Sequence, residues 1–332
     1  MYVRGINRKK YLKILINTLI FALVAGFGYY MVRSMVVGEI KAPSEDRGKI
    51  VRGNEDGFVS PYRKKGDFSV AFNIHSMDIF RNIIYIAQSH QVSLFNLSGG
   101  HIRDFRVEEG VRDIAVEDEV IFLLYPSRID LYSSEGEKKD EWGGYSSRTD
   151  YCSITTTDDY LFVSDAGNKL IFQYDKHGRL VRHINSPQGF IIPSYSFDII
   201  SIHDTLYCAN SGRHTIESYT MDGAFIQAFG TSGAQAGAFA GCCNPAYLTK
   251  NRHGHILTSE KGAPRISCYG RDGRFRTILF DANMLGGGTA AYRVAVSGEE
   301  LYIAGKKSVS TYCFDPNLGE KSCVGCSGGC HF

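Results

Sequence analysis

A similar stretch of sequence recurs six times along the chain, and this repeat restricts the fold more than any other feature. Each copy has a short apolar segment, a tight turn, a second apolar segment that ends near an aromatic residue, and a polar or glycine-containing turn. The copies begin at Ile84, Ile121, Leu161, Leu206, Ile256 and Leu301, with spacings of 37, 40, 45, 50 and 45 residues. Because a period of about 40 to 50 residues is typical of propeller blades, the repeats predict an all-β, six-bladed β-propeller.

A further apolar segment precedes each repeat from the second onward, which gives four strands per unit. These first strands are expected at 111–116, 152–156, 197–202, 246–250 and 292–296. The composition agrees, because 20 Tyr, 20 Phe and 36 Gly favour strands joined by glycine turns. Alternation of apolar and polar residues is imperfect, as expected when both faces of a sheet are buried. An irregular β-sandwich is the alternative fold, but it does not explain six units in register.

The third repeat resembles an NHL repeat. It runs from Val163 to Tyr174 and continues into the turn 175–178. The fourth repeat, 209–223, is similar but has Asn210 in place of the aspartate, and the fifth departs further. This resemblance implies a TolB-like six-bladed propeller over residues 68–318. It leaves the function open, because the family includes protein-binding modules, sugar-lactone hydrolases and a copper/zinc-dependent lyase.

The turn of the third repeat contains Asp165 and Asn168 at a spacing that suits a structural role. An aspartate side chain caps a tight turn by accepting hydrogen bonds from backbone N–H groups. Gly167 and Asn168 are expected to tolerate a positive φ at this turn. We therefore expect Asp165 to shape the turn and not to catalyse a reaction.

An uncharged apolar run precedes the repeats, from residue 14 to residue 32. At about 1.5 Å per residue, a helix of this length covers roughly the 30 Å of a bilayer core. Residues 1–13 hold five basic side chains and no acidic one, so the positive-inside rule places them in the cytoplasm. The sequence predicts a transmembrane helix over 14–32, a linker over 33–67, and a propeller in the extracytoplasmic space of a bacterial inner membrane. A cleaved signal peptide is the alternative.

The charge of the chain argues against a nucleic-acid partner. The whole chain has 37 basic and 35 acidic side chains, and removal of the five basic residues in 1–13 leaves 32 against 35. A nucleic-acid-binding domain would instead carry a clustered basic excess. The expected partners are the cytoplasmic membrane and a protein of the cell envelope.

The segment FAGCCNP, residues 239–245, lies between the fourth and fifth repeats and is expected at the rim of the central channel. Neighbouring cysteines bond to each other only through a strained eight-membered ring, so another partner is expected for each of Cys242 and Cys243. They are candidate metal or redox groups, and the alternative is that they fill a turn as small apolar residues. The candidate binding residues around them are Asn244, Glu260, Lys261 and Arg265.

The C-terminal tail, residues 319–332, is rich in cysteine. It offers four candidate ligands for a metal ion or an iron–sulfur cluster, namely Cys323, Cys326, Cys330 and His331. Disulfides in an oxidising compartment and thiol exchange with a partner are the alternatives. The other cysteines, Cys152, Cys208, Cys268 and Cys313, are expected to behave as small apolar residues in strands.

Taken as a whole, the sequence favours a membrane-anchored propeller that binds a protein or a ligand, within an envelope redox or metal-linked complex. It contains no GxSxG, P-loop or HExxH motif, which removes motif support for hydrolase, nucleotide-binding and zincin functions. The alternative is a metal-dependent lyase or hydrolase with its site at the channel mouth, around Cys242, Cys243 and Glu260.

Overall fold

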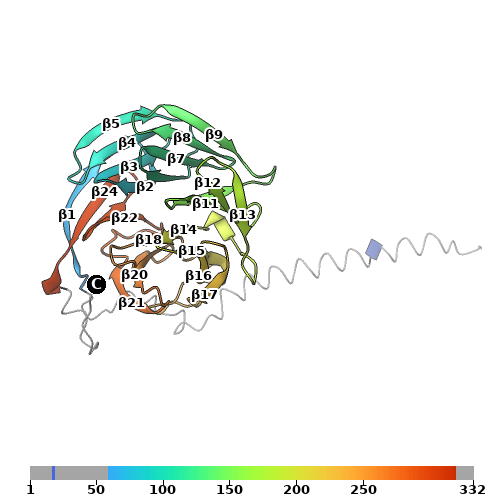
Figure 1. Ribbon diagram of the computed structural model, residues 1–332. Helices are drawn as coiled ribbons and strands as arrows, with labels where there is room; N and C mark the ends of the chain where they lie inside the picture. The colour runs from blue at the N-terminus through green and yellow to red at the C-terminus, as the bar shows by residue number, and fades with distance from the viewer. Residues whose placement is uncertain (1–16, 19–58, 319–332) are drawn as a thin grey trace, which may run out of the picture. The chain divides into compact units, whose positions relative to one another are not determined.

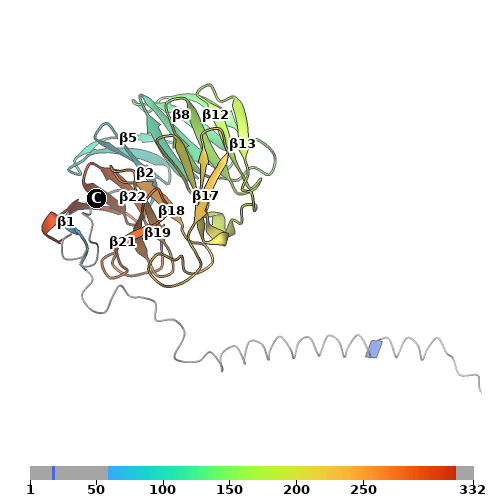
Figure 2. The ribbon, with the colours of Figure 1, turned by 60° about the horizontal axis from the view of Figure 1, so that its bottom comes forward.

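The computed structural model describes residues 17–18 and 59–318. Residues 59–318 form six four-stranded antiparallel sheets around a central axis, which confirms the predicted six-bladed β-propeller (Figures 1 and 2). Only two residues of the predicted transmembrane segment, Asn17 and Thr18, are described. Within the described part of the chain, no helix has the length and apolar character needed to cross a membrane.

In the first five blades the strands follow one another outward from the axis, as the repeat predicts. Blade 1 comprises β2 (Ile74–Phe80), β3 (Ile83–Gln88), β4 (Gln91–Asn96) and β5 (His101–Arg106), and blade 2 comprises β6 (Asp113–Glu117), β7 (Val120–Tyr125), β8 (Arg128–Ser133) and β9 (Lys138–Gly143). Blade 3 comprises β10 (Tyr151–Thr156), β11 (Tyr160–Asp165), β12 (Leu170–Asp175) and β13 (Leu180–Ile184), and blade 4 comprises β14 (Ile199–Ile202), β15 (Thr205–Asn210), β16 (Thr215–Thr220) and β17 (Phe225–Phe229). Blade 5 comprises β18 (Tyr247–Lys250), β19 (Ile256–Glu260), β20 (Arg265–Tyr269) and β21 (Phe275–Phe280). Two short 3-10 turns, η1 (Pro193–Tyr195) and η2 (Ser211–Arg213), lie in blade 4 and in the loop before it.

The sixth blade closes the ring with strands from both ends of the propeller. It comprises β22 (Arg293–Ser297), β23 (Glu300–Ala304), β24 (Ser308–Phe314) and β1 (Tyr62–Ser69), and β1 is antiparallel to β24. Residues 62–67, which the sequence assigned to the linker, therefore belong to a sheet. Their polar sequence hides the strand because β1 is outermost, and the side chains of residues 63–67 are exposed. Closure of this kind lets blade 6 pack against blade 1, so that the apolar faces of both blades are covered.

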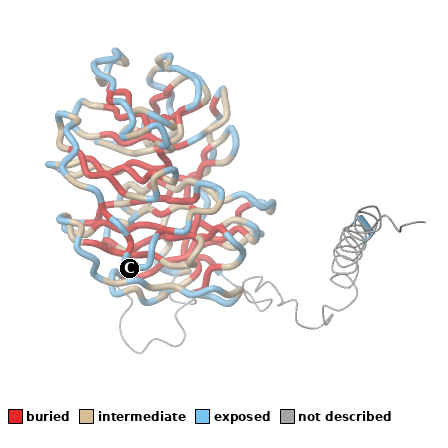
Figure 3. Tube along the Cα trace, turned by 90° about the vertical axis from the view of Figure 1, so that its right-hand side faces the viewer, coloured by how far each residue is buried: buried red, intermediate tan, exposed pale blue. Residues whose placement is uncertain are grey.

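The core consists of six apolar clusters, each between two adjacent blades. The cluster between blades 2 and 3, for example, joins Phe122 and Trp142 of blade 2 with Leu161 and Phe172 of blade 3. Inner strands are therefore buried on both faces, which explains the weak alternation in the sequence. Buried residues run through the middle of the blades, and exposed residues lie mainly at the loops (Figure 3).

The turn after β11 confirms the structural role predicted for Asp165. Its side chain is fully buried and accepts hydrogen bonds from the backbone N–H of Asp150 and of Asn168, both at 3.0 Å, and from Asn168 Nδ2 at 2.9 Å. The expected positive φ is found at Lys169, at 56°, and not at Gly167 or Asn168. Gly167 is needed for space, because a Cβ there would lie 1.7 Å from the carbonyl oxygen of Arg148.

Candidate functional site

A central channel runs between the six innermost strands and contains a cavity of about 390 Å³. Because the blades are related by rotation about the channel axis, all innermost strands begin at the same end of the channel. Side chains at equivalent positions of successive blades therefore meet around the axis. This geometry brings together residues that are about 40 positions apart in the sequence.

One residue from each blade contributes to a polar ring in this channel. The ring consists of Ser76, Asp113, Ser153, Asp198, Tyr247 and Arg293, which all line the cavity and lie within the first three residues of an innermost strand or directly before it. Arg293 Nη1 lies 3.0 Å from Asp198 Oδ1, and Arg293 Nη2 lies 3.6 Å from Asp113 Oδ1. The guanidinium carbon of Arg293 also lies 4.0 Å from the centre of the Tyr247 ring. One cation thus connects two carboxylates and an aromatic face across the channel.

The same carboxylates fix the blades to one another. The backbone N–H groups of innermost strands donate hydrogen bonds to side chains of the preceding blade, from Val116 to Asp78 (2.8 Å), from Ile154 to Asp113 (3.0 Å), from Ile199 to Ser153 (3.3 Å) and from Leu248 to Asp198 (2.6 Å). Ser76 Oγ adds a hydrogen bond to Asp113 Oδ1 at 2.5 Å. These bonds satisfy inward-facing backbone donors and hold the carboxylates in fixed positions.

Burial changes the charge balance of the channel. Desolvation raises the pKa of Asp78 to about 6, although hydrogen bonds from Val116 and Ile79 oppose this shift. Desolvation also raises the pKa of Asp198, with Arg293 opposing, and lowers the pKa of Lys250. Asp78 has no salt bridge among the residues that the structure describes. Asp78 is therefore a partly buried carboxylate without a directly bound cation among the described residues, although the charge of Lys250 opposes the rise of its pKa.

The predicted cysteine pair lies in the loop between β17 and β18. The sulfur atoms of Cys242 and Cys243 lie 2.8 Å apart; Cys242 is exposed and Cys243 is buried. Cys243 Sγ also lies 3.7 Å from Ser194 Oγ. The charge of Lys261 acts on both thiols. The structure thus brings Cys242, Cys243 and Lys261 together, as the sequence suggested. Neither cysteine is among the residues that line the channel cavity.

The remaining predicted binding residues maintain the structure around this loop. Asn244 Nδ2 donates to the carbonyl oxygens of Ala240 (2.6 Å) and Lys261 (2.9 Å), and Asn244 Oδ1 accepts the Lys261 backbone N–H at 2.9 Å. Glu260 and Arg265 face each other across the β19–β20 hairpin and form an ion pair of 2.7 Å. Their side chains are 1% and 8% exposed. Glu260 is therefore engaged by Arg265 in the protein interior.

The metal ligands suggested by the sequence are only partly covered by the structure. Cys323, Cys326, Cys330 and His331 lie outside the described residues. Within the described ranges, no group of three or more His, Cys, Asp or Glu side chains is arranged to hold a metal ion. Cys152, Cys208 and Cys268 are buried in the blades, as expected for small apolar residues, whereas Cys313 is partly exposed.

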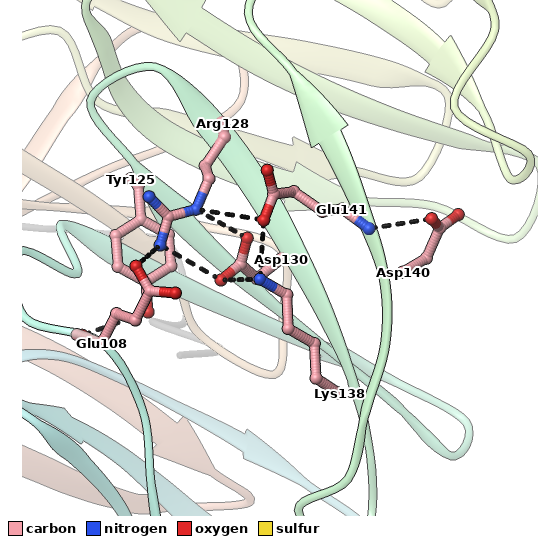
Figure 4. A network of polar contacts seen from close by, with 7 residues as sticks. All are labelled: Glu108, Tyr125, Arg128, Asp130, Lys138, Asp140 and Glu141. Carbon is pink, nitrogen blue, oxygen red and sulfur yellow. Dashed lines mark hydrogen bonds and ion pairs between the residues drawn. The ribbon is translucent and has the colours of Figure 1, made fainter.

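A second polar cluster lies in blade 2 and has its charges satisfied internally (Figure 4). The fully buried Asp130 lies 2.8 Å from Arg128 Nε and 3.0 Å from Lys138 Nζ. Arg128 also lies 2.6 Å from Glu108 and stacks 4.0 Å above the Tyr125 ring. Because both cations already have carboxylate partners, we interpret this cluster as a structural clamp between strands.

The polar ring was not predicted from the sequence. Its signal is a charged residue next to a short apolar strand at the same position of different repeats, as in Asp113-Ile-Ala-Val, Asp198-Ile-Ile and Arg293-Val-Ala-Val. A comparison within one repeat does not show this pattern. Alignment of the first strands of all repeats would have shown it.

Comparison with known proteins supports the fold. No family model matches the chain, and no curated protein matches it. Among solved structures, virginiamycin B lyase from Staphylococcus aureus has a TM-score of 0.54 at 11% identity, covering 76% of this chain and 99% of the lyase. A streptogramin B lyase has a TM-score of 0.55 at 12% identity, covering 76% of this chain and 98% of its own. A Bacteroides thetaiotaomicron protein of unknown function has a TM-score of 0.53 at 14% identity, covering 76% and 74% of the two chains. The chain is a six-bladed β-propeller. At such low identity, these likenesses show the architecture alone.

Proposed function

We propose that this protein is a membrane-anchored, extracytoplasmic binding propeller of the NHL/TolB-like type, and that its channel binds a small polar ligand with a protonated amine. The observation that carries the proposal is the cavity of about 390 Å³ with Asp78 in its wall, partly buried and without a salt bridge among the described residues. A cavity of this size suits a small molecule. A buried carboxylate without a cation favours a positively charged group beside it.

Two further observations support the proposal. The hydrogen bonds between blades hold the channel carboxylates in place before any ligand arrives, which reduces the ordering cost of binding. A propeller neighbour, an inactive variant of virginiamycin B lyase, was solved with quinupristin, so this architecture accommodates a ligand in that protein. The uncharged run 14–32 after five basic residues supports the anchor and its orientation.

The alternative metal-dependent enzyme has less support from the geometry. It needs Glu260 together with the two cysteines, but Glu260 is 1% exposed and already pairs with Arg265. We therefore prefer the binding function to the metal-dependent enzyme, and we propose that the binding takes place within an envelope redox complex.

The test compares three four-carbon probes of different charge: putrescine, 1,4-butanediol and succinate. We expect only putrescine to raise the unfolding temperature of the protein at pH 7.5. The stabilisation should approach about 2.7 kcal/mol at one hundred times the dissociation constant.

Two variants locate the site. Asp78→Asn should abolish the effect of putrescine, whereas Asp158→Asn should retain it, because Asp158 is an exposed carboxylate that lines the same cavity. Equal shifts with all three probes, or a putrescine effect that persists in Asp78→Asn, would show that the channel carboxylate does not select a cation.

A further inference from the structure

The cysteine pair is placed for chemistry between its own two sulfur atoms. Cys242 Sγ and Cys243 Sγ lie 2.8 Å apart, so each is the nearest thiol partner of the other. Ring strain predicted a separate partner for each of the two cysteines, but in the structure both side chains lie on the same side of the loop. Cys242 is exposed to solvent, and Cys243 lies beneath it.

The surroundings of the pair are fixed by the next residue in the chain. Asn244 is 1% exposed, and its side chain binds both the N–H and the C=O of Lys261 at 2.9 Å. This clamp ties the backbone of Lys261 to the residue that follows the two cysteines. Lys261 Nζ in turn donates to Ser196 Oγ at 3.2 Å.

Charge and hydrogen bonding favour one thiolate in the pair. Desolvation acts against ionisation of Cys243, but hydrogen bonds from Cys242 and Ser194 and the charge of Lys261 together lower its pKa. A hydrogen bond with Cys243 and the charge of Cys243 raise the pKa of Cys242. The two sulfurs thus share one proton, and the negative charge is favoured on Cys243.

The other described cysteines do not form such a pair: the partly exposed Cys313 donates to the carbonyl oxygen of Arg63 at 3.6 Å, and the rest are buried. Burial raises the pKa of Cys152 and of Cys268 to about 12, and raises that of Cys208. Buried thiols of this kind are inert, because the thiolate is the reactive species. Among the described residues, the reactive thiol chemistry is concentrated at Cys242 and Cys243.

We propose that Cys242 and Cys243 form a redox-active dithiol that exchanges two electrons with a disulfide-bearing partner. Cys242, the exposed thiol, passes its proton to the Cys243 thiolate and attacks one sulfur of the partner disulfide, which forms a mixed disulfide and releases the first partner thiolate. Cys243 then attacks Cys242 Sγ, and the bond between the two cysteines forms as the second partner thiolate leaves. The one proton of the pair passes from Cys243 to one partner thiolate and solvent protonates the other, so the dithiol is oxidised and the partner disulfide is reduced. This activity is independent of ligand binding in the channel.

The loop sequence makes this chemistry directly measurable. Trypsin cleavage after Arg213 and Lys250 releases the peptide 214–250, in which Cys242 and Cys243 are the only cysteines. The full-length protein is incubated with glutathione disulfide as a low-molecular-weight partner, or with insulin as a protein partner. Remaining thiols are alkylated, and the mass of the peptide is measured by mass spectrometry. We expect the wild-type peptide to lack two hydrogens and to resist alkylation after incubation with at least one of the two partners.

Matched variants identify the roles of the two thiols. In Cys243→Ser, the attack by Cys242 proceeds but cannot be completed, so peptide 214–250 should accumulate one glutathione adduct. In Cys242→Ser, the buried Cys243 should remain alkylatable and without an adduct. Lys261→Met keeps the backbone clamp to Asn244 and should slow formation of the disulfide. Circular dichroism verifies that each variant is folded. The test of the wild-type protein does not depend on the variants.

Three results would overturn the proposal. The first is a wild-type peptide with both thiols alkylated after each of the two separate incubations, with excess glutathione disulfide and with excess insulin. The second is the same adduct pattern in Cys242→Ser and Cys243→Ser. The third is loss of the intrapeptide disulfide when Cys323, Cys326 and Cys330 are replaced by Ser, because the pair would then depend on the tail for its oxidation.

Discussion

Replacement of Arg265 by methionine tests whether Glu260 and Arg265 are structural. The change removes the only cation within 4 Å of Glu260 among the described residues and keeps a long apolar side chain in its place. It also removes hydrogen bonds from the guanidinium to the carbonyl oxygens of Ala234, Gln235 and Ala238. Because the two side chains are 1% and 8% exposed, solvent cannot replace the lost partner.

The expected loss of stability can be derived from the chemistry of Glu260. Without Arg265, the buried carboxyl becomes protonated to avoid an isolated charge. Protonation at pH 7 of a group with an ordinary pKa of 4.5 costs about 3.4 kcal/mol, the product of 2.5 pH units and 1.36 kcal/mol per unit; this is an upper bound, because desolvation already raises the pKa of Glu260 in the wild-type protein. Loss of the carbonyl hydrogen bonds adds about 1 kcal/mol. The total of about 4 kcal/mol lies within the range measured for broken buried ion pairs.

The pH dependence has a defined sign. In Arg265→Met, the folded-state pKa of Glu260 lies above its unfolded-state value, so the charged form is disfavoured in the folded protein. The charge penalty is therefore complete above the folded-state pKa and disappears as the pH falls toward 4.5. We expect the loss of stability to shrink to about 1 kcal/mol near pH 4.5.

The assay is urea unfolding followed by far-UV circular dichroism and by fluorescence of Trp142, the single tryptophan. Trp142 lies between blades 2 and 3, away from the substituted hairpin, so coincident curves from both signals indicate cooperative unfolding. The matched control is Arg276→Met, which breaks an exposed pair with Asp272 in the same blade and should cost less than about 1 kcal/mol.

Two results would contradict the reasoning. One is a loss below about 1 kcal/mol for Arg265→Met at pH 7. The other is an equal loss when Glu260→Gln is already present, because the neutral amide removes the charge penalty. Either result would revive the interpretation that these residues serve a ligand.

Two further predictions concern the blades and the channel. Gly167→Ala should destabilise the protein by at least about 2 kcal/mol in thermal unfolding, because the new Cβ would meet the carbonyl oxygen of Arg148. The control is Gly66→Ala, which has open space around it and should change stability by less than about 0.5 kcal/mol. Putrescine affinity, measured by calorimetry, should be constant between about pH 7 and 9, where its amines stay protonated, and fall about tenfold per pH unit below the Asp78 pKa of about 6. An affinity independent of pH below 7 would exclude Asp78 as the binding carboxylate.

The repeat in the sequence was sufficient to predict the architecture and most strand positions. The first strand of the third repeat was expected at 152–156 and is found at Tyr151–Thr156. Local patterns succeed here because each blade is built from consecutive strands with short turns. The strand β1 was missed because its side chains are exposed and charged and its partner β24 lies at the other end of the repeats.

The site was harder to predict because its geometry depends on rotation about the channel axis. Arg293 meets Asp198 and Asp113 only when the ring is closed, although these residues are 95 and 180 positions apart in the sequence. Glu260 and Arg265 show a different limitation. Their separation of five residues matches a cross-strand pair in a tight hairpin, and the register confirms this pairing. Residue type suggested a ligand site, whereas hairpin register would have suggested an ion pair.

The pairing of β1 with β24 has a consequence for the order of events during synthesis. The first strand of the propeller leaves the ribosome early, but its only sheet partner is the last strand, and Tyr62 pairs with Phe314. Blades 1 to 5 use strands that are neighbours in the chain, so each can form as soon as it has emerged. Blade 6 must wait for the whole propeller sequence. Until then β1 has no sheet partner, and the apolar face of blade 1 that packs against blade 6 stays uncovered and accessible to chaperones or to aggregation.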